Sequence, residues 1–245
     1  MTLQLHILIP TYNDKDTLPS VVARLATFGL PVLIVDDGSA ADAAQVLDTL
    51  ASAHPFVTLL RRPVNGGKGM AVRDGIADLH ARGATHALQI DADDQHCLDD
   101  IPRFVAAARS NPNALVLGTP VFGGDAPRGR VIGRNISRFW VTLETLSRAI
   151  HDPLFGYRVY PVADTFALQQ RVRIGARMDF DPEIAVRLYW RGLDVINIPS
   201  QVRYPEGGVS RFRMFRDNAR ISWMHTRLFI GMLFRLPRLV ARHFK

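Results

Sequence analysis

The first 118 residues alternate between short apolar segments and longer helical patterns, and this alternation restricts the fold more than any other feature. The apolar segments are rich in Leu, Ile and Val and stop at Pro, Gly, Asp or Asn, as buried strands do: 3–9, 31–37, 56–61, 85–90 and 114–118. The helical patterns lie between them: 18–28, 40–53, 68–82 and 99–110. This order predicts a Rossmann-like α/β fold, with a mainly parallel sheet and helices on both faces.

Local end signals agree with these helices, and the pattern changes after Gly118. Ser39 and Asp99 stand where N-caps belong, and Gly83 is a suitable C-cap. A Gly- and Pro-rich loop is followed by further predicted elements: helix 134–150, the strand FGYRVYP, helix 182–190 and the strand LDVINIP. We therefore predict one domain, 1–210, with halves 1–118 and 119–210, and a basic amphipathic helical tail, 211–245.

Polar side chains follow three of the predicted strands at the points where those strands end. The first strand leads into Thr11-Tyr12-Asn13-Asp14, the second into Asp36-Asp37-Gly38-Ser39, and the fourth into an acidic run, 91–94. Open parallel sheets bind their ligands at the carboxyl ends of the strands. We therefore expect the functional site at this edge of the sheet.

The acidic run lies in the sequence LQIDADDQH and directly follows a buried segment. If the extended chain continues, side chains two residues apart share a face, so Asp91, Asp93 and Gln95 point the same way. Two carboxylates and an amide oxygen suit Mg²⁺ or Mn²⁺. The alternative is that the acids cap the next helix and face solvent. That alternative fits Asp94 and Asp99 better than Asp91, which adjoins the buried strand.

Two further motifs suit a nucleotide. VDDGS ends a buried strand in two carboxylates that can bond a ribose or a base edge, and Gly38 permits a tight turn. Its alternative is a simple β–α turn with Ser39 as the N-cap. NGGKGMA is a Gly-rich loop entering a helix, where backbone N–H groups and Lys68 suit phosphate. It has neither the P-loop spacing nor the dinucleotide fingerprint.

The net charge of +7 comes from the tail. Residues 211–245 hold eight Arg, one Lys and one Asp, which leaves the rest of the chain slightly acidic. A neutral body argues against a nucleic-acid-binding face. Basic residues mixed with large apolar ones suit a helix lying on an anionic membrane surface. The alternative is a helix that packs on its own domain or on a partner.

The single cysteine, the first residues and the short apolar runs indicate the cellular compartment. The single cysteine, Cys97, excludes an internal disulfide and fits a reducing environment. The first residues lack the basic region of a secretory signal, and no apolar run approaches the roughly 18 residues that span a bilayer. We therefore expect a cytoplasmic protein that is peripheral on the inner face of the cell membrane.

Four motifs follow one another along the chain: IPTYND, VDDGS, NGGKGMA with Arg73 downstream, and DADDQ. Their order resembles that in the family 2 glycosyltransferases of the GT-A fold. The resemblance is greatest to the dolichol-phosphate and polyprenyl-phosphate sugar transferase branch, and it extends from about Ile9 to Tyr204. MDFDPEIAVRLYWRGLDVINIP resembles the family's acceptor-side helix and the strand after it. VRYPEGGVSRFR resembles its R-x-x-G-x-S-K segment, with Arg211 in the Lys position and one additional residue.

The resemblance implies a donor site, a metal site and an acceptor site. The nucleotide-sugar pocket would be lined by Pro10, Tyr12, Asp14, Asp36, Asp37, Lys68 and Asp91. Mg²⁺ or Mn²⁺ would be bound by Asp91, Asp93 and Gln95 and would bridge the diphosphate. The acceptor would contact Arg158, Arg203, Ser210 and Arg211.

The family's reaction is an inverting single displacement with a nucleoside diphosphate as the leaving group. A hydroxyl acceptor needs a general base, for which Asp181 is the first choice and Asp179 and Glu183 are the others. Asp179 or Asp181 alternatively caps the helix. A phosphate-monoester acceptor is already ionised and needs an Arg clamp rather than a base. The candidates for that clamp are Arg130, Arg134, Arg158, Arg203 and Arg211.

We therefore expect a metal-dependent, inverting glycosyltransferase that moves a sugar from a UDP- or GDP-sugar to a lipid-linked or lipid-like acceptor at the membrane surface. A membrane enzyme that takes the product onward would be a partner. The alternative enzyme, a nucleotidylyltransferase, predicts a Gly-rich basic loop where IPTYND stands. The other alternative, a non-catalytic membrane-binding interaction protein, predicts a degenerate acidic site, whereas Asp91, Asp93 and Gln95 are all present.

Overall fold

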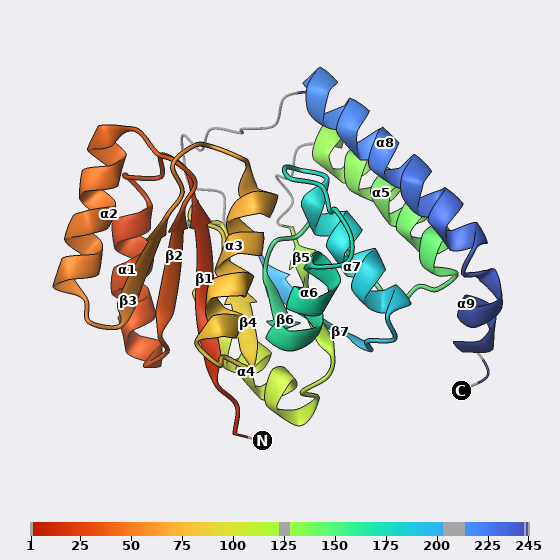
Figure 1. Cartoon of the computed structure of the whole chain (residues 1–245), viewed down its shortest axis with the longest axis horizontal. Helices are drawn as coiled ribbons and strands as arrows, with labels where there is room; N and C mark the ends of the chain where they lie inside the picture. Colours follow the sequence, from red (N-terminus) through yellow and green to blue (C-terminus); the bar gives the residue numbers. More distant parts are fainter. Residues whose placement is uncertain (1, 123–127, 203–213, 243, 245) are drawn as a thin grey trace.

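The computed structural model describes residues 2–122, 128–202, 214–242 and 244. Over these ranges the chain forms a seven-stranded sheet of order β3-β2-β1-β4-β6-β5-β7 (Figure 1). The strands are β1 (Leu5–Thr11), β2 (Val32–Asp36), β3 (Val57–Arg61), β4 (His86–Gln89), β5 (Leu115–Val121), β6 (Arg158–Pro161) and β7 (Val195–Gln201).

The sheet is mainly parallel, as predicted. β1 pairs in parallel with β2 and β4, β2 with β3, and β5 with β7. β6 runs antiparallel between β4 and β5. All five strands predicted in the first half are present, and of FGYRVYP only Arg158–Pro161 forms a strand.

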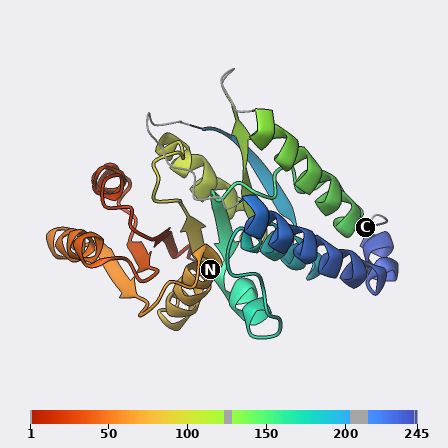
Figure 2. The same ribbon diagram turned by 90° about the horizontal axis from the view of Figure 1, so that it is seen from above.

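Helices cover both faces of the sheet (Figures 1 and 2). One face packs against α1 (Leu18–Leu25), α2 (Ala41–Ala53) and α4 (Ile101–Ser110). The other packs against α3 (Lys68–Ala81), α6 (Val162–Gln169) and α7 (Phe180–Trp190). The pleat of β1 separates the two cores, because Leu8 joins the α3 side while Ile7 and Ile9 join the α1 side.

Several predicted element ends differ from the structure. The N-cap of α2 is Ala40, while Ser39 Oγ instead accepts the Asn13 N–H. Asp99 lies inside the short 3₁₀ helix η2 (Leu98–Asp100), so neither predicted N-cap is confirmed. Gly83, at φ +77°, follows the C-cap of α3 in the left-handed region that favours glycine.

The helix predicted at 134–150 is α5 (Arg128–Thr145), which starts and stops earlier. Its end is marked by Leu146, which has a φ of +50°. The helix predicted at 18–28 is α1 followed by the 3₁₀ helix η1 (Ala26–Phe28). Apolar periodicity thus found these helices but did not fix their ends, and it gave no prediction of α6.

The tail forms α8 (Met214–Leu233) and α9 (Leu236–Arg242). α8 lies beside α5 and also contacts α7, so α5 and α8 form an outer layer (Figures 1 and 2). Pro237 stands in the first turn of α9, where its missing N–H is tolerated. Among the described residues, none of the helices combines the length and apolarity that crossing a bilayer requires.

Candidate functional site

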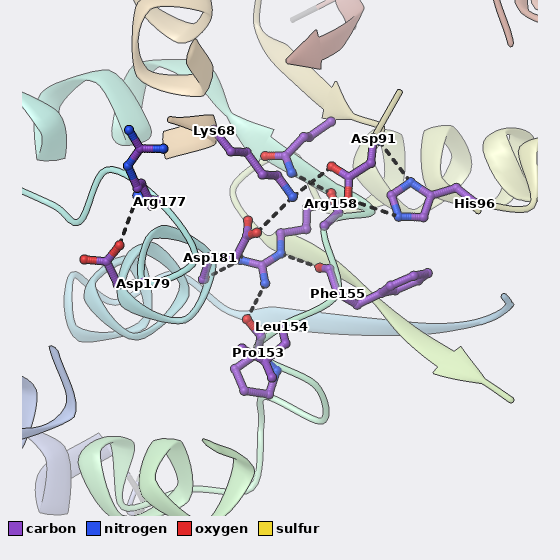
Figure 3. A network of polar contacts seen from close by, with 12 residues as sticks. Lys68, Asp91, His96, Pro153, Leu154, Phe155, Arg158, Arg177, Asp179 and Asp181 are labelled. Carbon is purple, nitrogen blue, oxygen red and sulfur yellow. Dashed lines mark hydrogen bonds and ion pairs between the residues drawn. The ribbon is translucent and has the colours of Figure 1, made fainter. Parts of the chain in front are cut away.

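Lys68 joins two carboxylates that come from different halves of the chain (Figure 3). Lys68 begins α3, Asp91 follows β4, and Asp181 lies in the first turn of α7. Its Nζ is 2.8 Å from Asp91 Oδ1 and 2.9 Å from Asp181 Oδ2. Burial alone would lower the pKa of Lys68, but the charges of Asp181 and Asp91 outweigh burial and raise it. The amine therefore stays protonated between the two acids.

Asp91 and Asp93 lie close together although the chain does not continue as a strand. β4 ends at Gln89, and the chain turns at 92–94, where Asp94 has a φ of +57°. Burial, and then the charge of Asp91, raise the pKa of Asp93 to about 6. Burial would also raise the pKa of Asp91, but the neighbouring Lys68 lowers it. A turn, rather than an extended run, therefore brings the two acids together.

This acidic cluster fits a divalent cation that is shared with a substrate. Asp181 Oδ1 is buried and accepts no hydrogen bond from the described residues. The negative charge of Asp93 is disfavoured by burial and by Asp91, so a bound cation would relieve it. Within the described ranges, no three His, Cys, Asp or Glu side chains are grouped to hold a metal on their own. Further oxygen ligands would come from Gln95, water or a diphosphate.

Gly156, just before β6, brings its backbone against this cluster. A Cβ at this position would lie 2.5 Å from Lys68 Nζ and 2.6 Å from Asp91 Oδ2. A Cβ atom does not approach a non-bonded atom so closely, so even a methyl group would displace the amine or the carboxylate. The loop before β6 therefore depends on glycine for the shape of the site.

We expect Gly156→Ala to weaken Mn²⁺-dependent nucleotide binding by at least about tenfold, because the added methyl moves Lys68 or Asp91. Calorimetric titration of the folded variant measures this effect. The matched control is Gly133→Ala in α5, where a Cβ meets nothing within 4 Å. Wild-type affinity in Gly156→Ala would show that the close approach has no role in binding.

His96 is a site residue for which ligand spacing in the sequence gives no signal. Its ring is buried, its Nδ1 accepts the Asp91 N–H at 3.2 Å, and its Nε2 lies 3.7 Å from Asp91 Oδ2. Burial lowers the pKa of His96 to about 4, so the ring is neutral at physiological pH. The one sequence signal available is its place directly after the acidic run.

Asp36 belongs to the framework of the predicted nucleotide pocket. Its side chain is fully buried at the end of β2. Its Oδ1 accepts the Ser39 N–H, and its Oδ2 accepts from Arg61 Nε, both at 2.9 Å. A direct contact of Asp36 with a nucleotide stays a prediction.

Asp37 holds the Gly-rich loop. It accepts the N–H groups of Gly66 at 2.9 Å and Gly67 at 2.6 Å, and it pairs with Arg62. Gly67 has a φ of +98°, which other residues rarely adopt. VDDGS therefore sets the loop that leads into Lys68, and the nucleotide contact predicted for Asp37 stays a prediction.

The residues at the end of β1 and directly after it are those predicted to line the nucleotide pocket. Pro10 is buried within β1, whereas Tyr12 is 36% exposed. Asp14 Oδ2 accepts from Thr11 Oγ1 and from the Tyr12 N–H, both at 3.0 Å. The nucleotide-pocket roles predicted for Pro10, Tyr12 and Asp14 stay predictions.

Of the three acids considered as general base, Glu183 makes contacts that stabilise the fold. It is fully buried in α7, and its Oε2 accepts the Gly175 N–H at 2.8 Å. Its Oε1 pairs with Arg187 at 2.7 Å, and its Oε2 pairs with Arg227 of α8 at 3.1 Å. These contacts tie α7 to the tail and do not direct Glu183 at the cluster.

Asp179 and Asp181 are near neighbours in the chain but make different contacts. Asp179 is the N-cap residue of α7 without a side-chain cap hydrogen bond, and its Oδ1 instead accepts the Arg177 N–H at 3.0 Å. Figure 3 shows this contact apart from Lys68. Asp181 alone among the three candidate acids pairs with Lys68. A base role for any of these acids stays a prediction.

The acceptor-binding role predicted for Arg158 is not supported. Its side chain is fully buried, and its guanidinium donates to the backbone carbonyls of Phe155, Asp181 and Pro153. Arg158 therefore fastens the loop before β6 to α7 beneath the site (Figure 3). The other predicted acceptor residues, Arg203, Ser210 and Arg211, lie outside the described residues.

The remaining arginines considered for an acceptor clamp are in α5. Arg134 NH1 pairs with Asp152 Oδ2 at 2.5 Å. The side chain of Arg130 lies outside the described part of the structure. The structure thus gives no complete Arg clamp among its described side chains.

Comparison with known proteins identifies the family. The glycosyl transferase family 2 model matches residues 6–172, which is more than half of the chain. A polyprenol monophosphomannose synthase of Mycolicibacterium smegmatis is 28% identical over 219 residues, covering 84% of this chain and 79% of that protein. An undecaprenyl-phosphate mannosyltransferase of Micrococcus luteus is 27% identical over 201 residues, covering 78% of this chain and 80% of that protein.

Solved structures with the same fold agree. Glucosyl-3-phosphoglycerate synthase from Mycobacterium tuberculosis, in complex with Mn²⁺, UDP-glucose and phosphoglyceric acid, has a TM-score of 0.66 at 16% identity, covering 97% of this chain and 80% of that one. A mannosyltransferase from Pyrobaculum calidifontis, in complex with GDP-mannose and Mn²⁺, has a TM-score of 0.59 at 17% identity, covering 98% and 74%. With the family model, the fold and these relatives in agreement, the chain belongs to glycosyltransferase family 2 and is a glycosyltransferase of the GT-A fold.

Proposed function

We propose that this glycosyltransferase moves a sugar from a UDP- or GDP-sugar to a polyprenyl-type phosphate, with Mg²⁺ or Mn²⁺ held at Asp91 and Asp93. The observation that carries the proposal is the pairing of Lys68 with both Asp91 and Asp181, which joins the acidic run to the acceptor-side helix. The names of the relatives from M. smegmatis and M. luteus support the acceptor. The solved complexes with Mn²⁺ and a UDP- or GDP-sugar support the donor.

The roles of the residues follow from their charges. A bound cation supplies positive charge that stabilises the departing diphosphate. Asp91, Asp93 and Gln95 would hold it, and the protonated Lys68 places a second positive charge beside it. A phosphate acceptor has a second pKa of about 6 and needs no base. Asp181 then orients Lys68, and a base role arises only with a hydroxyl acceptor.

A transfer assay tests this function. The purified protein is offered radiolabelled UDP-glucose, UDP-N-acetylglucosamine or GDP-mannose, with undecaprenyl phosphate or undecaprenol in detergent, and with Mn²⁺ or EDTA. We expect a labelled lipid from one donor, formed with the phosphate lipid and Mn²⁺ only. Transfer to undecaprenol instead would refute the phosphate acceptor. Absence of both transfer and Mn²⁺-dependent nucleotide binding would refute the proposed function.

The raised pKa of Asp93 predicts how cation binding depends on pH. Because burial and Asp91 hold this pKa at about 6, the carboxylate is ionised above that pH and protonated below it. A cation needs the ionised form, so Mn²⁺ affinity should be steady above about pH 7 and fall by up to about tenfold per unit below about pH 6. Titrations of the protein with nucleotide between about pH 5 and 8 measure this. A flat profile would exclude Asp93 as a ligand.

The outer layer of the fold supports a position on a membrane surface. α8 packs one apolar face inward through Met224, Leu228 and Met232. It also exposes the large apolar side chains Phe215, Trp223, Ile230 and Leu233, and the exposed Phe234 follows its last residue. α5 adds three at helical spacing: Ile132, Ile136 and Phe139. Exposed Arg216 and Arg220 flank the α8 set, which suits an anionic bilayer.

We expect the double substitution Trp223→Ser and Phe234→Ser to weaken partition into vesicles of phosphatidylglycerol and phosphatidylcholine by at least about tenfold. Both side chains are exposed, so the loss of apolar contact with lipid is not accompanied by unfolding. Vesicle co-sedimentation measures the change, and Val64→Ser, an exposed valine next to β3, is the control. Unchanged partition of the folded double variant would assign this face to a protein partner or to no partner.

A further inference from the structure

The imidazole of His96 lies beside the Asp91 carboxylate (Figure 3). The intervening turn folds the chain back, so that His96 Nδ1 accepts the Asp91 N–H at 3.2 Å. His96 Nε2 lies 3.7 Å from Asp91 Oδ2. One side chain thus contacts both the backbone and the carboxylate of the same residue.

These contacts specify the tautomer. A ring nitrogen that accepts a backbone N–H carries no proton, so the proton of the neutral ring is on Nε2. That N–H faces the Asp91 carboxylate. A metal-binding group is commonly oriented by such an outer partner, whose hydrogen bond fixes its direction.

The Asp91 N–H needs a partner from outside the sheet. The ladders of β4 with β1 and with β6 both stop at Gln89, and the Ile90 N–H still donates to Leu8 O of β1. The N–H of the next residue, Asp91, is directed to the β6 side, where the ladder has already ended. His96 therefore supplies the acceptor that a neighbouring strand would otherwise provide, and a buried N–H left without one is costly.

Aromatic side chains hold the ring in place. His96 stacks on Tyr157, with centroids 4.8 Å apart and planes 7° apart, and Phe155 meets it edge-on at 4.8 Å. Tyr157 in turn stacks on Phe104 of α4 at 4.1 Å. Gly156 lies between the two aromatic residues and approaches Asp91. The loop before β6 therefore fixes both the His96 ring and the other side of the carboxylate.

We propose that His96 is a positioning residue that holds Asp91 in the orientation needed to bind the divalent cation, chiefly through the bond from the Asp91 N–H to Nδ1. This inference rests on the proposed function, because it assigns the cation to Asp91. The competing explanation is that His96 is only a packing residue in the aromatic stack.

Two substitutions separate positioning from packing. His96→Asn keeps an acceptor, Oδ1, near the place of Nδ1 but removes the ring. His96→Phe keeps a ring for the stack but removes the acceptor. Positioning predicts that Asn is the better substitute for cation binding, and packing predicts that Phe is. His86→Asn, a buried histidine at the other end of β4, controls for the loss of any buried imidazole.

Calorimetry with Mn²⁺, in the presence of whichever of UDP or GDP the wild type binds, measures the ranking. We expect His96→Phe to weaken Mn²⁺ binding by at least about tenfold, and His96→Asn and His86→Asn to stay within about threefold of the wild type. The inference is overturned if folded His96→Phe binds like the wild type, or if His96→Asn binds as weakly as His96→Phe. If the wild type binds neither nucleotide with Mn²⁺, the proposed function fails instead.

Amide hydrogen exchange of the metal-free wild type tests the contact without any variant. The Asp91 amide should be protected from exchange, because its N–H is bonded to a buried ring. Exchange at the rate of an unbonded amide would overturn the inference even if His96→Phe did not fold. In folded His96→Asn the protection should persist, and in folded His96→Phe it should be lost.

Discussion

Replacing Asp93 by asparagine should abolish Mn²⁺-dependent nucleotide binding and, at the same time, make the metal-free protein more stable. The first effect follows because an amide is a far weaker ligand than a carboxylate for a hard cation. We expect the transfer rate to fall by at least about a thousandfold, since the charge on the departing diphosphate would lose its counter-ion. Calorimetry and the transfer assay measure these two losses.

The gain in stability follows from the sign of the pKa shift. Asp93 ionises near 3.8 in an unfolded chain and at about 6 in the folded one, mainly because it is buried. Above about pH 6 the folded state therefore carries an unfavourable charge, worth at most ~3 kcal/mol at 1.36 kcal/mol per pKa unit. Asparagine removes that charge. The gain should be present at neutral pH and disappear below about pH 4.

The matched control is Asp94→Asn, which changes the next carboxylate in the chain. Asp94 pairs with Arg24 at 2.8 Å rather than facing Lys68. This variant should keep Mn²⁺ binding and should not gain stability. If Asp93→Asn instead bound Mn²⁺ and nucleotide like the wild type, the metal would have to lie elsewhere. A loss of stability would mean that Asp93 serves the fold.

Opposite effects on stability and on binding distinguish a functional charge from a structural one. Like charges at Asp91 and Asp93 are held together by the fold, since Lys68 and the turn at 92–94 fix their positions. A protein does not benefit from this arrangement until a cation enters it. The arrangement is therefore better explained by ligand binding than by helix capping.

The fold could be predicted from the sequence where strands are continuous apolar runs. β2 is buried along its whole length, so Val32–Asp36 reads as a strand without any knowledge of its neighbours. β6 was predicted only as part of the longer segment FGYRVYP, and its bounds and antiparallel direction could not be predicted in this way. The strand comprises Arg158–Pro161 only, and its direction depends on pairing with β4 and β5 rather than on local pattern.

The same distinction between local pattern and tertiary contact applies to the candidate site. Asp91 and Lys68 could be predicted as site residues because each lies within a recognisable local motif. The contact of Asp181 with Lys68 was not, because it joins α3 to α7 across a large separation in sequence. The buried setting of Arg158 was also invisible, since an arginine in a strand gives no sign of whether its guanidinium faces a ligand or backbone carbonyls.

Replacing Lys68 by methionine should produce the second large effect, a loss of both activity and stability. Without the ammonium group, Asp91 and Asp181 face each other partly buried and lack their shared cation. Removing one partner of a buried ion pair costs up to about 3–5 kcal/mol, and Arg158, 3.8 Å from Asp181, offsets part of it. We expect transfer to fall by at least about a hundredfold. Thermal unfolding and the transfer assay measure the two effects.

A double substitution separates the causes. Adding Asp181→Asn to Lys68→Met removes one of the two unpaired charges, so stability should largely return. Activity should not return, because the positive charge next to the diphosphate is still missing. Lys15→Met, the same change in an exposed pair with Asp42, should alter neither property. If activity recovered together with stability, Lys68 would be a structural residue. Its pairing with the acidic run and the acceptor-side helix would then have no role in catalysis.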